Sequence, residues 1–154
     1  MFYEIVLATH SAVRWLVLIS LLYAIFRGAK GWMGGGQFTH ADGVARLAAS
    51  VIVRVQFVVG VALYILSPIT AYFVSDIRKA MDFPEVRFFG LEHVAMTVIA
   101  IGLISIGEIR SKKAPDDKKK FSRMTIFYVI ALLVILAAIP WPFSHSSRPL
   151  FRPF

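Results

Sequence analysis

Four long apolar stretches set the strongest limit on what this chain can fold into. They cover residues 5–26, 45–66, 90–109 and 123–139; the second stops just before Pro68, and the fourth is ended by Pro140. A helix needs roughly 20 predominantly apolar residues to cross the hydrocarbon core of a bilayer. The stretches are rich in Leu, Ile, Val and Ala without strict alternation, so helices fit them better than barrel strands. We therefore predict an all-α membrane protein, a four-transmembrane-helix bundle that forms one domain over residues 1–154.

The composition supports a bilayer rather than water as the solvent. Hydrophobic residues make up 58% of the chain and charged residues 17%, whereas a soluble domain usually has about 25% charged residues. A chain of 154 residues has too much surface to hide this many apolar side chains in a globule. The chain has no cysteine, which excludes disulfides, cysteine-bound iron–sulfur clusters and covalently attached c-type haem.

The distribution of basic residues predicts the topology. The connections between the first and second stretches and between the third and fourth, counted together with Arg46 and Arg123 at the adjoining ends of the stretches, carry ten Lys and Arg residues, against five on the other side. Because Lys- and Arg-rich loops remain in the cytoplasm, we expect both termini on the non-cytoplasmic side of a bacterial inner membrane. The basic segment 110–123 contains a single aromatic residue, Phe121, and no repeated alternation of basic and aromatic residues, so we expect membrane lipid and no nucleic acid as its partner.

Two of the stretches share a pattern that points to a common site. His10 precedes Arg27 by seventeen positions, and His93 precedes Arg110 by the same number. Seventeen residues of helix span about 25 Å, and the first and third helices run in the same direction. His10 and His93 should therefore lie at nearly equal depth, just inside the outer face, where they can face each other across the bundle. The alternative for each histidine is an ordinary hydrogen-bonding role at the interface.

Two arginines lie inside the apolar stretches. An arginine at the bilayer centre costs about 2.5–3.5 kcal/mol on insertion scales, so it needs an anion or a polar neighbour. Arg14 lies one helical turn from His10, where it could meet a haem propionate, a quinone carbonyl or a lipid phosphate. Arg54 either pairs with Glu108 or snorkels to the interface, or it faces the same cavity as Arg14 and helps to bind an anionic group.

Other polar residues allow further readings. His145 follows the fourth stretch, so a metal site made of His10, His93, His145 and a carboxylate is an alternative, although no HxxxH or HExxH pattern supports it. His40 lies at the opposite end, where we expect it to be solvated. Within residues 67–90 we expect a short helix on the membrane interface. Its apolar side would consist of Tyr72, Phe73, Ile77, Ala80 and Met81.

Three segments carry a resemblance to a known family. They are ATHSAVRWLVLISLLYAIFRGAKGWMG, RFFGLEHVAMTVIAIGLISIGEIRSKKA and IFYVIALLVILAAIPWPF. With these segments the chain resembles small four-helix bacterial membrane proteins described as cytochrome-b-like, which occur especially in Bacteroidetes-type organisms. The resemblance covers most of the chain and implies a haem b carried by His10 and His93. Only His40 remains for the other side, so a second bis-histidine haem is not expected.

From these observations we predict a b-type haem membrane subunit that relays electrons, with quinone as a possible donor or acceptor. His10 and His93 would be the axial ligands of the haem iron, and Arg14 would hold a propionate. One alternative is a non-catalytic accessory subunit of a larger membrane complex, without a cofactor of its own. Another is a small transporter or quinone-modifying protein that uses Arg14 and Arg54. We expect membrane lipids and other subunits of a membrane complex as partners.

Overall fold

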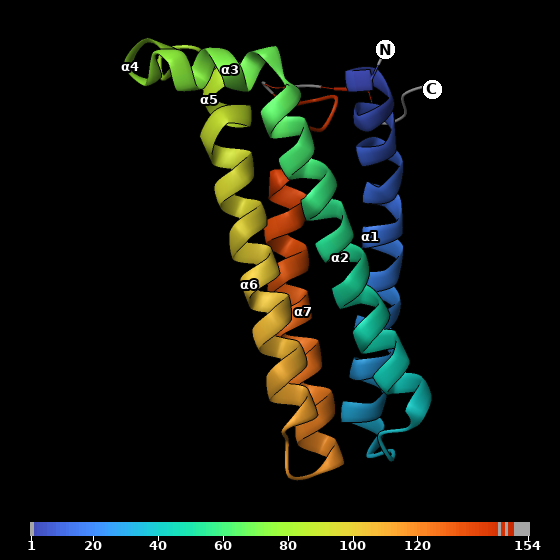
Figure 1. The fold of residues 1–154 in the computed structure, drawn as a ribbon. Coiled ribbons are helices and arrows are strands. Elements are labelled where there is room, and N and C mark those ends of the chain that lie inside the picture. The colour runs from blue at the N-terminus through green and yellow to red at the C-terminus, as the bar shows by residue number, and fades with distance from the viewer. Residues whose placement is uncertain (1, 145, 147, 150–154) are drawn as a thin grey trace.

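Four long helices form an up-and-down bundle (Figure 1). A computed structural model describes residues 2–144, 146, 148 and 149. The long helices are α1 (Phe2–Gly34), α2 (His40–Leu66), α6 (His93–Lys112) and α7 (Asp117–Ala138). Each is long and apolar enough to cross a membrane, α6 together with the helical turns that lead into it from Pro84. The described residues include no strand. The prediction of an all-α bundle of four transmembrane helices is confirmed.

The helices are arranged so that α1 and α6 lie diagonally across the bundle. α1 packs against α2 and α7, while α6 packs closely against α7 and only lightly against α2. Figure 1 shows α1 and α6 running in one direction and α2 and α7 in the other, with the start of α1 and the end of α7 at the same end of the bundle. A side chain on α1 can therefore meet one on α6 only by pointing into the interior.

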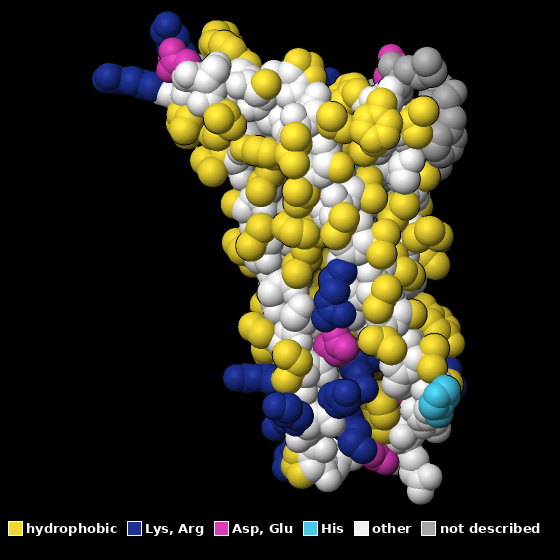
Figure 2. Space-filling model, in the orientation of Figure 1, with side chains coloured by type: hydrophobic (Ala, Val, Ile, Leu, Met, Phe, Trp, Pro, Cys, Tyr) yellow, Lys and Arg dark blue, Asp and Glu magenta, His cyan; other side chains and the backbone are white. Residues whose placement is uncertain are grey.

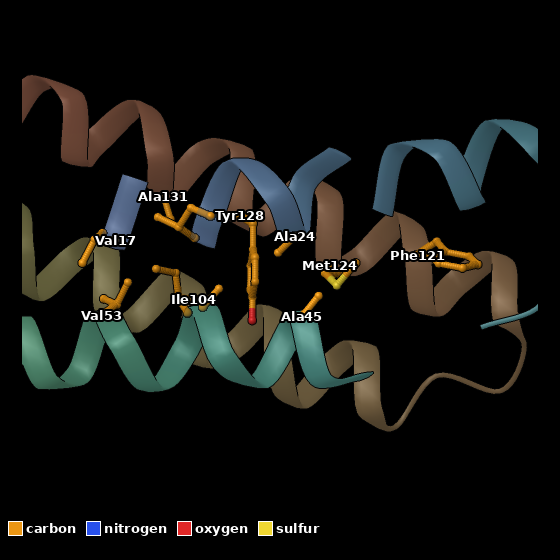
Figure 3. Packing of buried hydrophobic residues seen from close by; sticks show 11 residues of the cluster. Val17, Ala24, Ala45, Val53, Ile104, Phe121, Met124, Tyr128 and Ala131 are labelled. Carbon is orange, nitrogen blue, oxygen red and sulfur yellow. The ribbon is translucent and has the colours of Figure 1, made fainter. Parts of the chain in front are cut away.

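All four helices contribute to the apolar core. Tyr128 and Met124 of α7 are fully buried and lie among small side chains such as Ala24 and Ala45 (Figure 3). The outer surface is also apolar: Val58 is 67% exposed and Ile65 is 75% exposed. An apolar exterior around an apolar core is what lipid as a solvent allows, and a water-soluble bundle does not show it.

Helix α1 continues beyond the expected end at residue 26 and reaches Gly34. The first part of the segment that follows residue 26 is helical, and its glycines let α7 approach. A Cβ atom on Gly28 would lie 2.4 Å from Thr125 Oγ1, and one on Gly31 would lie 2.3 Å from the Phe121 ring. The connection to α2 begins only at Gly35, whose φ of 64° suits glycine.

Residues 67–90 form several short helices across the end of the bundle. They are α3 (Pro68–Ser75), α4 (Ile77–Ala80) and α5 (Pro84–Arg87), followed by the π-helical turn η1 (Phe88–Glu92). Helix α3 lies across the bundle axis (Figure 1). The expected single apolar side is only partly present, because the segment is broken at Asp76 into α3 and α4 and does not form one continuous helix: Phe73 and Ala80 are buried, whereas three other members are exposed. The exposed members are Tyr72, Ile77 and Met81.

Positive charge is concentrated at the end of the bundle away from the termini. The end of α1, the first half of α2, the end of α6, the start of α7 and the connection between α6 and α7 bring together eleven basic and four acidic residues, a net charge of +7 out of +8 for the chain. Figure 2 shows basic side chains gathered at this end, which we call the basic end. Its basic residues are Arg27, Lys30, Arg46, Arg54, Arg110, Lys112, Lys113, Lys118, Lys119, Lys120 and Arg123, and its acidic residues are Asp42, Glu108, Asp116 and Asp117.

Candidate cofactor site

The structure brings His10 and His93 together inside the bundle. His10 lies on α1, and His93 is the first residue of α6. Their ring centroids are 6.2 Å apart, and the ring planes are inclined at 68°. Since α1 and α6 are diagonal helices, the two imidazoles meet across the interior rather than at a helix–helix contact. The two histidines, which we expected at equal depth, therefore also lie close together.

Both rings lie in the wall of a cavity of about 540 Å³ between the four long helices, at the end where the termini lie. This volume is in the range of small-molecule and cofactor sites. Most of the wall is apolar, and the described lining residues include no Asp or Glu. The charged or strongly polar side chains in the wall are His10, His93, Arg14, Arg148 and Gln56.

The orientation of the His93 ring is fixed by a hydrogen bond. Its Nδ1 atom lies 2.7 Å from the carbonyl oxygen of Ala138, at the end of α7. A carbonyl oxygen only accepts, so Nδ1 carries the proton and donates it. Nε2 is then the ring nitrogen with a free lone pair. Histidines that bind metals usually donate their other N–H group to a carbonyl or carboxylate in this way.

The backbone that leads into His93 is also specialised. The π-helical turn η1 ends in a bond from the His93 N–H to the Phe88 carbonyl. Tyr64 of α2 donates its hydroxyl to the Gly90 carbonyl at 3.0 Å, and a Cβ on Gly90 would lie 2.2 Å from Cγ of Phe73. Such turns insert an extra residue into a helix and are frequent at functional sites. Because His93 directly follows this turn, the turn affects the direction in which the His93 side chain points.

His10 has less support from its surroundings. Its Nδ1 atom is buried without a hydrogen-bond partner among the described residues. Gly60 of α2 faces the ring, and a Cβ there would lie 3.3 Å from His10 Cε1. Gln56, one turn before Gly60, donates its Nε2–H group to the His10 carbonyl oxygen at 3.0 Å. A glycine at this position leaves room for the imidazole and for whatever shares the cavity with it.

The two arginines expected at the site have different positions. Arg14 lines the cavity one turn from His10, with its guanidinium 3.5 Å from Ser11 Oγ and 5.5 Å from the centroid of the Trp15 ring. Arg54 is not in the cavity wall; its Nη2 donates to Glu108 Oε2 at 2.7 Å. Of the alternatives for Arg54, the structure shows the pair with Glu108 and separates this arginine from the histidines.

The remaining histidines do not join the pair within the described structure. His40 is exposed at the start of α2, at the basic end. His145 lies outside the described residues, and with it the alternative metal site of three histidines. Glu92, the carboxylate next to His93, pairs with Arg87 at 2.7 Å. No group of three or more His, Asp or Glu side chains with metal-binding geometry occurs in the described part of the chain.

Two residues of the site were not expected from the sequence. Arg148, beyond the last span, lines the cavity, pairs with Glu85 and lies over the Phe89 ring at 5.1 Å. No periodicity extends to that position, so the sequence contained no signal for it. Gln56 did carry a signal, since it is an amide in an apolar helix, but its depth relative to His10 emerges only from the packed bundle.

Comparisons with known proteins do not identify a family or a function for this chain. No protein-family model, no curated protein and no solved structure matches this chain.

Proposed function

We propose that this chain is a membrane subunit that holds one haem b between His10 and His93 and relays electrons. The observation that carries the proposal is the pair of imidazoles from diagonal helices, 6.2 Å apart in an apolar cavity. Two imidazoles that share one metal ion have ring centres roughly 6 Å apart, because each metal–nitrogen bond is about 2 Å long and each nitrogen stands out from its ring centre. The separation therefore fits two histidines that would hold one iron.

The donor chemistry also fits. Bis-histidine ligation needs a neutral ring nitrogen on each side of the porphyrin. The bond to Ala138 makes Nε2 of His93 such a nitrogen. His10 has a buried ring nitrogen without a partner among the described residues, which would cost about 1–3 kcal/mol if nothing satisfied it. The residues present thus suit an iron porphyrin.

The charges in the cavity wall favour an occupant with acidic substituents. Arg14 and Arg148 both line the cavity, and no carboxylate does among the described lining residues; Arg148 is already paired with Glu85 outside this wall, so Arg14 is the arginine assigned to an acidic group of the occupant. An apolar body with acidic groups at its edge matches this wall, and haem b has that character through its two propionates. Arginine suits carboxylates because its planar fork can donate two parallel hydrogen bonds.

Each residue would then have a defined task. His10 and His93 would hold the iron, Arg14 would bind a propionate, and the apolar wall would exclude water. Haem, when bound, supplies one-electron chemistry, which the protein tunes through ligands, burial and charge. The positive charge of Arg14 favours the reduced state and raises the reduction potential. Because the cavity lies near one end of the bundle, electrons would be exchanged with a partner or a quinone at that membrane surface.

The proposal includes an orientation. With the basic end in the cytoplasm, the cavity lies on the outer side of a bacterial inner membrane. A donor, an acceptor or another subunit of a membrane complex would then approach from that side.

One observation favours a second candidate. The inclined His10 and His93 rings also make an edge-to-face contact that can stabilise a bundle without any cofactor. In that case the chain would be an accessory subunit of a larger membrane complex. The spectroscopic test below separates the two functions.

The test is the absorption spectrum of detergent-purified protein, oxidised and then reduced with dithionite, for the wild type and for His10→Ala, His93→Ala and His40→Ala. We expect a Soret band and sharp reduced α and β bands in the wild type and in His40→Ala, and their loss in the other two variants. A colourless wild type from cells supplied with haem would overturn the proposal and favour the accessory role.

A further inference from the structure

A row of polar side chains joins α2 to α6 in the half of the bundle away from the cavity. We call it the polar seam and define it by Arg46, Ser50, Arg54, Glu108 and Ser111. The first three are spaced by four residues, so they share one face of α2. Glu108 Oε2 accepts from Ser50 Oγ at 2.5 Å and from Arg54 Nη2 at 2.7 Å, and Arg46 Nη1 donates to Ser111 Oγ at 2.9 Å.

The seam is buried on its inner side and open on its outer side. Ser50 and Ser111 are fully buried, whereas the Arg54 side chain is 45% exposed and that of Glu108 is 18% exposed. Each arginine has five N–H donors, of which the described contacts use few. The Nε atom of Arg46 has no hydrogen-bond partner among the described residues. The seam therefore has donor capacity left after its internal bonds are made.

The carboxylates of the basic end do not balance its charge. All four are in ion pairs, which are Arg27–Asp42, Arg54–Glu108, Lys119–Asp116 and Lys120–Asp117. The net charge of +7 at this end must then be balanced from outside the chain. Figure 2, which looks onto α2 and α6, shows basic and acidic side chains extending from the basic end up between hydrophobic ones. The anion that fits this setting has a charged head and an apolar body.

We infer that the polar seam binds the phosphate of an anionic phospholipid, whose acyl chains lie along the outer faces of α2 and α6. Val51 and Val55 of α2 and Ile106 of α6 are exposed beside the seam, at 44%, 49% and 44%. Basic pockets between transmembrane helices bind phospholipid head groups in this manner, and the guanidinium fork matches phosphate oxygens. A phospholipid can contact the polar seam with its phosphate and the exposed apolar side chains beside it with its acyl chains. A free anion can contact only the seam. The inference is independent of the haem proposal.

The test is thermal unfolding of the full chain in detergent with added phosphatidylglycerol, phosphatidylcholine or inorganic phosphate. The seam variant is Arg54→Gln combined with Glu108→Gln, which leaves the net charge unchanged and leaves no charged member of the pair alone. The control is Lys112→Gln combined with Lys113→Gln, which removes two charges at the same end, outside the seam. Native mass spectrometry of bound phosphatidylglycerol gives a second readout that does not depend on stability.

We expect phosphatidylglycerol to raise the Tm of the wild type by roughly 5 °C relative to phosphatidylcholine. The seam variant should lose most of this shift and of the bound lipid, and the lysine control should keep both. An equal shift with phosphatidylcholine, or a full shift with inorganic phosphate alone, would overturn the inference. So would a shift that survives in the seam variant and disappears in the lysine control, because diffuse surface charge would then explain it.

Discussion

Single glycines decide where side chains can enter the interior of this bundle. Gly60 and Gly102 both lie in the middle of membrane-spanning helices, yet their surroundings differ. A Cβ on Gly60 would lie 3.3 Å from His10 Cε1, whereas one on Gly102 would meet nothing within 4 Å. Glycine in a helix costs roughly 0.5–1 kcal/mol relative to alanine. Gly60 therefore has a local reason to be glycine, and Gly102 has none in the described structure.

We predict opposite consequences for two matched substitutions at these positions. Gly102→Ala should raise stability by about 0.5–1 kcal/mol and leave haem content unchanged. Gly60→Ala should displace the His10 ring and lower the haem bound per chain, with little or no gain in stability. Thermal unfolding and the Soret absorbance of both proteins check this. Equal haem content in the two variants would contradict the role given to Gly60.

At the scale of the elements, the π-helical turn η1 is the part of the site that hydropathy does not reveal. It is held where Gly90 meets Phe73 of α3 and Tyr64 of α2. Because the turn positions His93, we expect the contacts of Gly90 with Phe73 and Tyr64 to affect both the stability of the bundle and the placement of His93 beside His10.

Gly90→Ala tests this support. The new Cβ would lie 2.2 Å from Phe73 Cγ, and such overpacking typically costs 1–3 kcal/mol. Combining Gly90→Ala with Phe73→Ala should recover part of the loss relative to the sum of the single variants. The measurement is a double-mutant cycle from unfolding curves. Strict additivity would show that the two sites are not in contact.

The start of α7 gives a prediction of pH dependence. The Asp116 carboxylate accepts a hydrogen bond from the Lys119 backbone N–H at 2.8 Å, and this bond lowers the pKa of Asp116 below its usual value. A lowered folded-state pKa means that the stabilisation is present above the unfolded value of about 4 and is lost as the pH falls through the folded value.

Asp116→Asn keeps an acceptor at the helix start but removes the titrating group. The Tm of the variant should therefore fall less steeply than that of the wild type when the pH is lowered below about 4. Parallel melting series at stepped pH values measure the difference. Identical slopes would mean that Asp116 does not contribute to the acid sensitivity.

At the scale of the whole molecule, the sequence predicts the features that depend on hydropathy and on residue spacing along a helix. Length and hydropathy indicate the four spans, and the equal spacing of His10 and His93 from Arg27 and Arg110 indicates their common depth. What the sequence left open depends on tertiary packing: which partner Arg54 takes, that Gln56 reaches His10, and that Arg148 folds back onto the cavity. The extension of α1 beyond residue 26 was not predicted because it depends on Gly28 and Gly31 fitting against α7, a contact that no local pattern reports.

The charge asymmetry of the molecule predicts its orientation in the membrane. With eleven basic residues at one end, that end should face the cytoplasm. The chain has no cysteine, so single-cysteine variants can be read without background. Asp82→Cys should react with a membrane-impermeant maleimide at the periplasmic face of intact spheroplasts, and Lys118→Cys only after lysis. The reverse pattern would place the termini in the cytoplasm.

The central claim is that His10 and His93 together hold one haem b. Its most direct measurement is the pyridine haemochrome content per polypeptide, for protein purified from membranes of cells supplied with a haem precursor. The account predicts one haem b per chain in the wild type and none in the His10→Ala/His93→Ala double variant. A wild type without haem, or a double variant that retains one haem per chain, would contradict it.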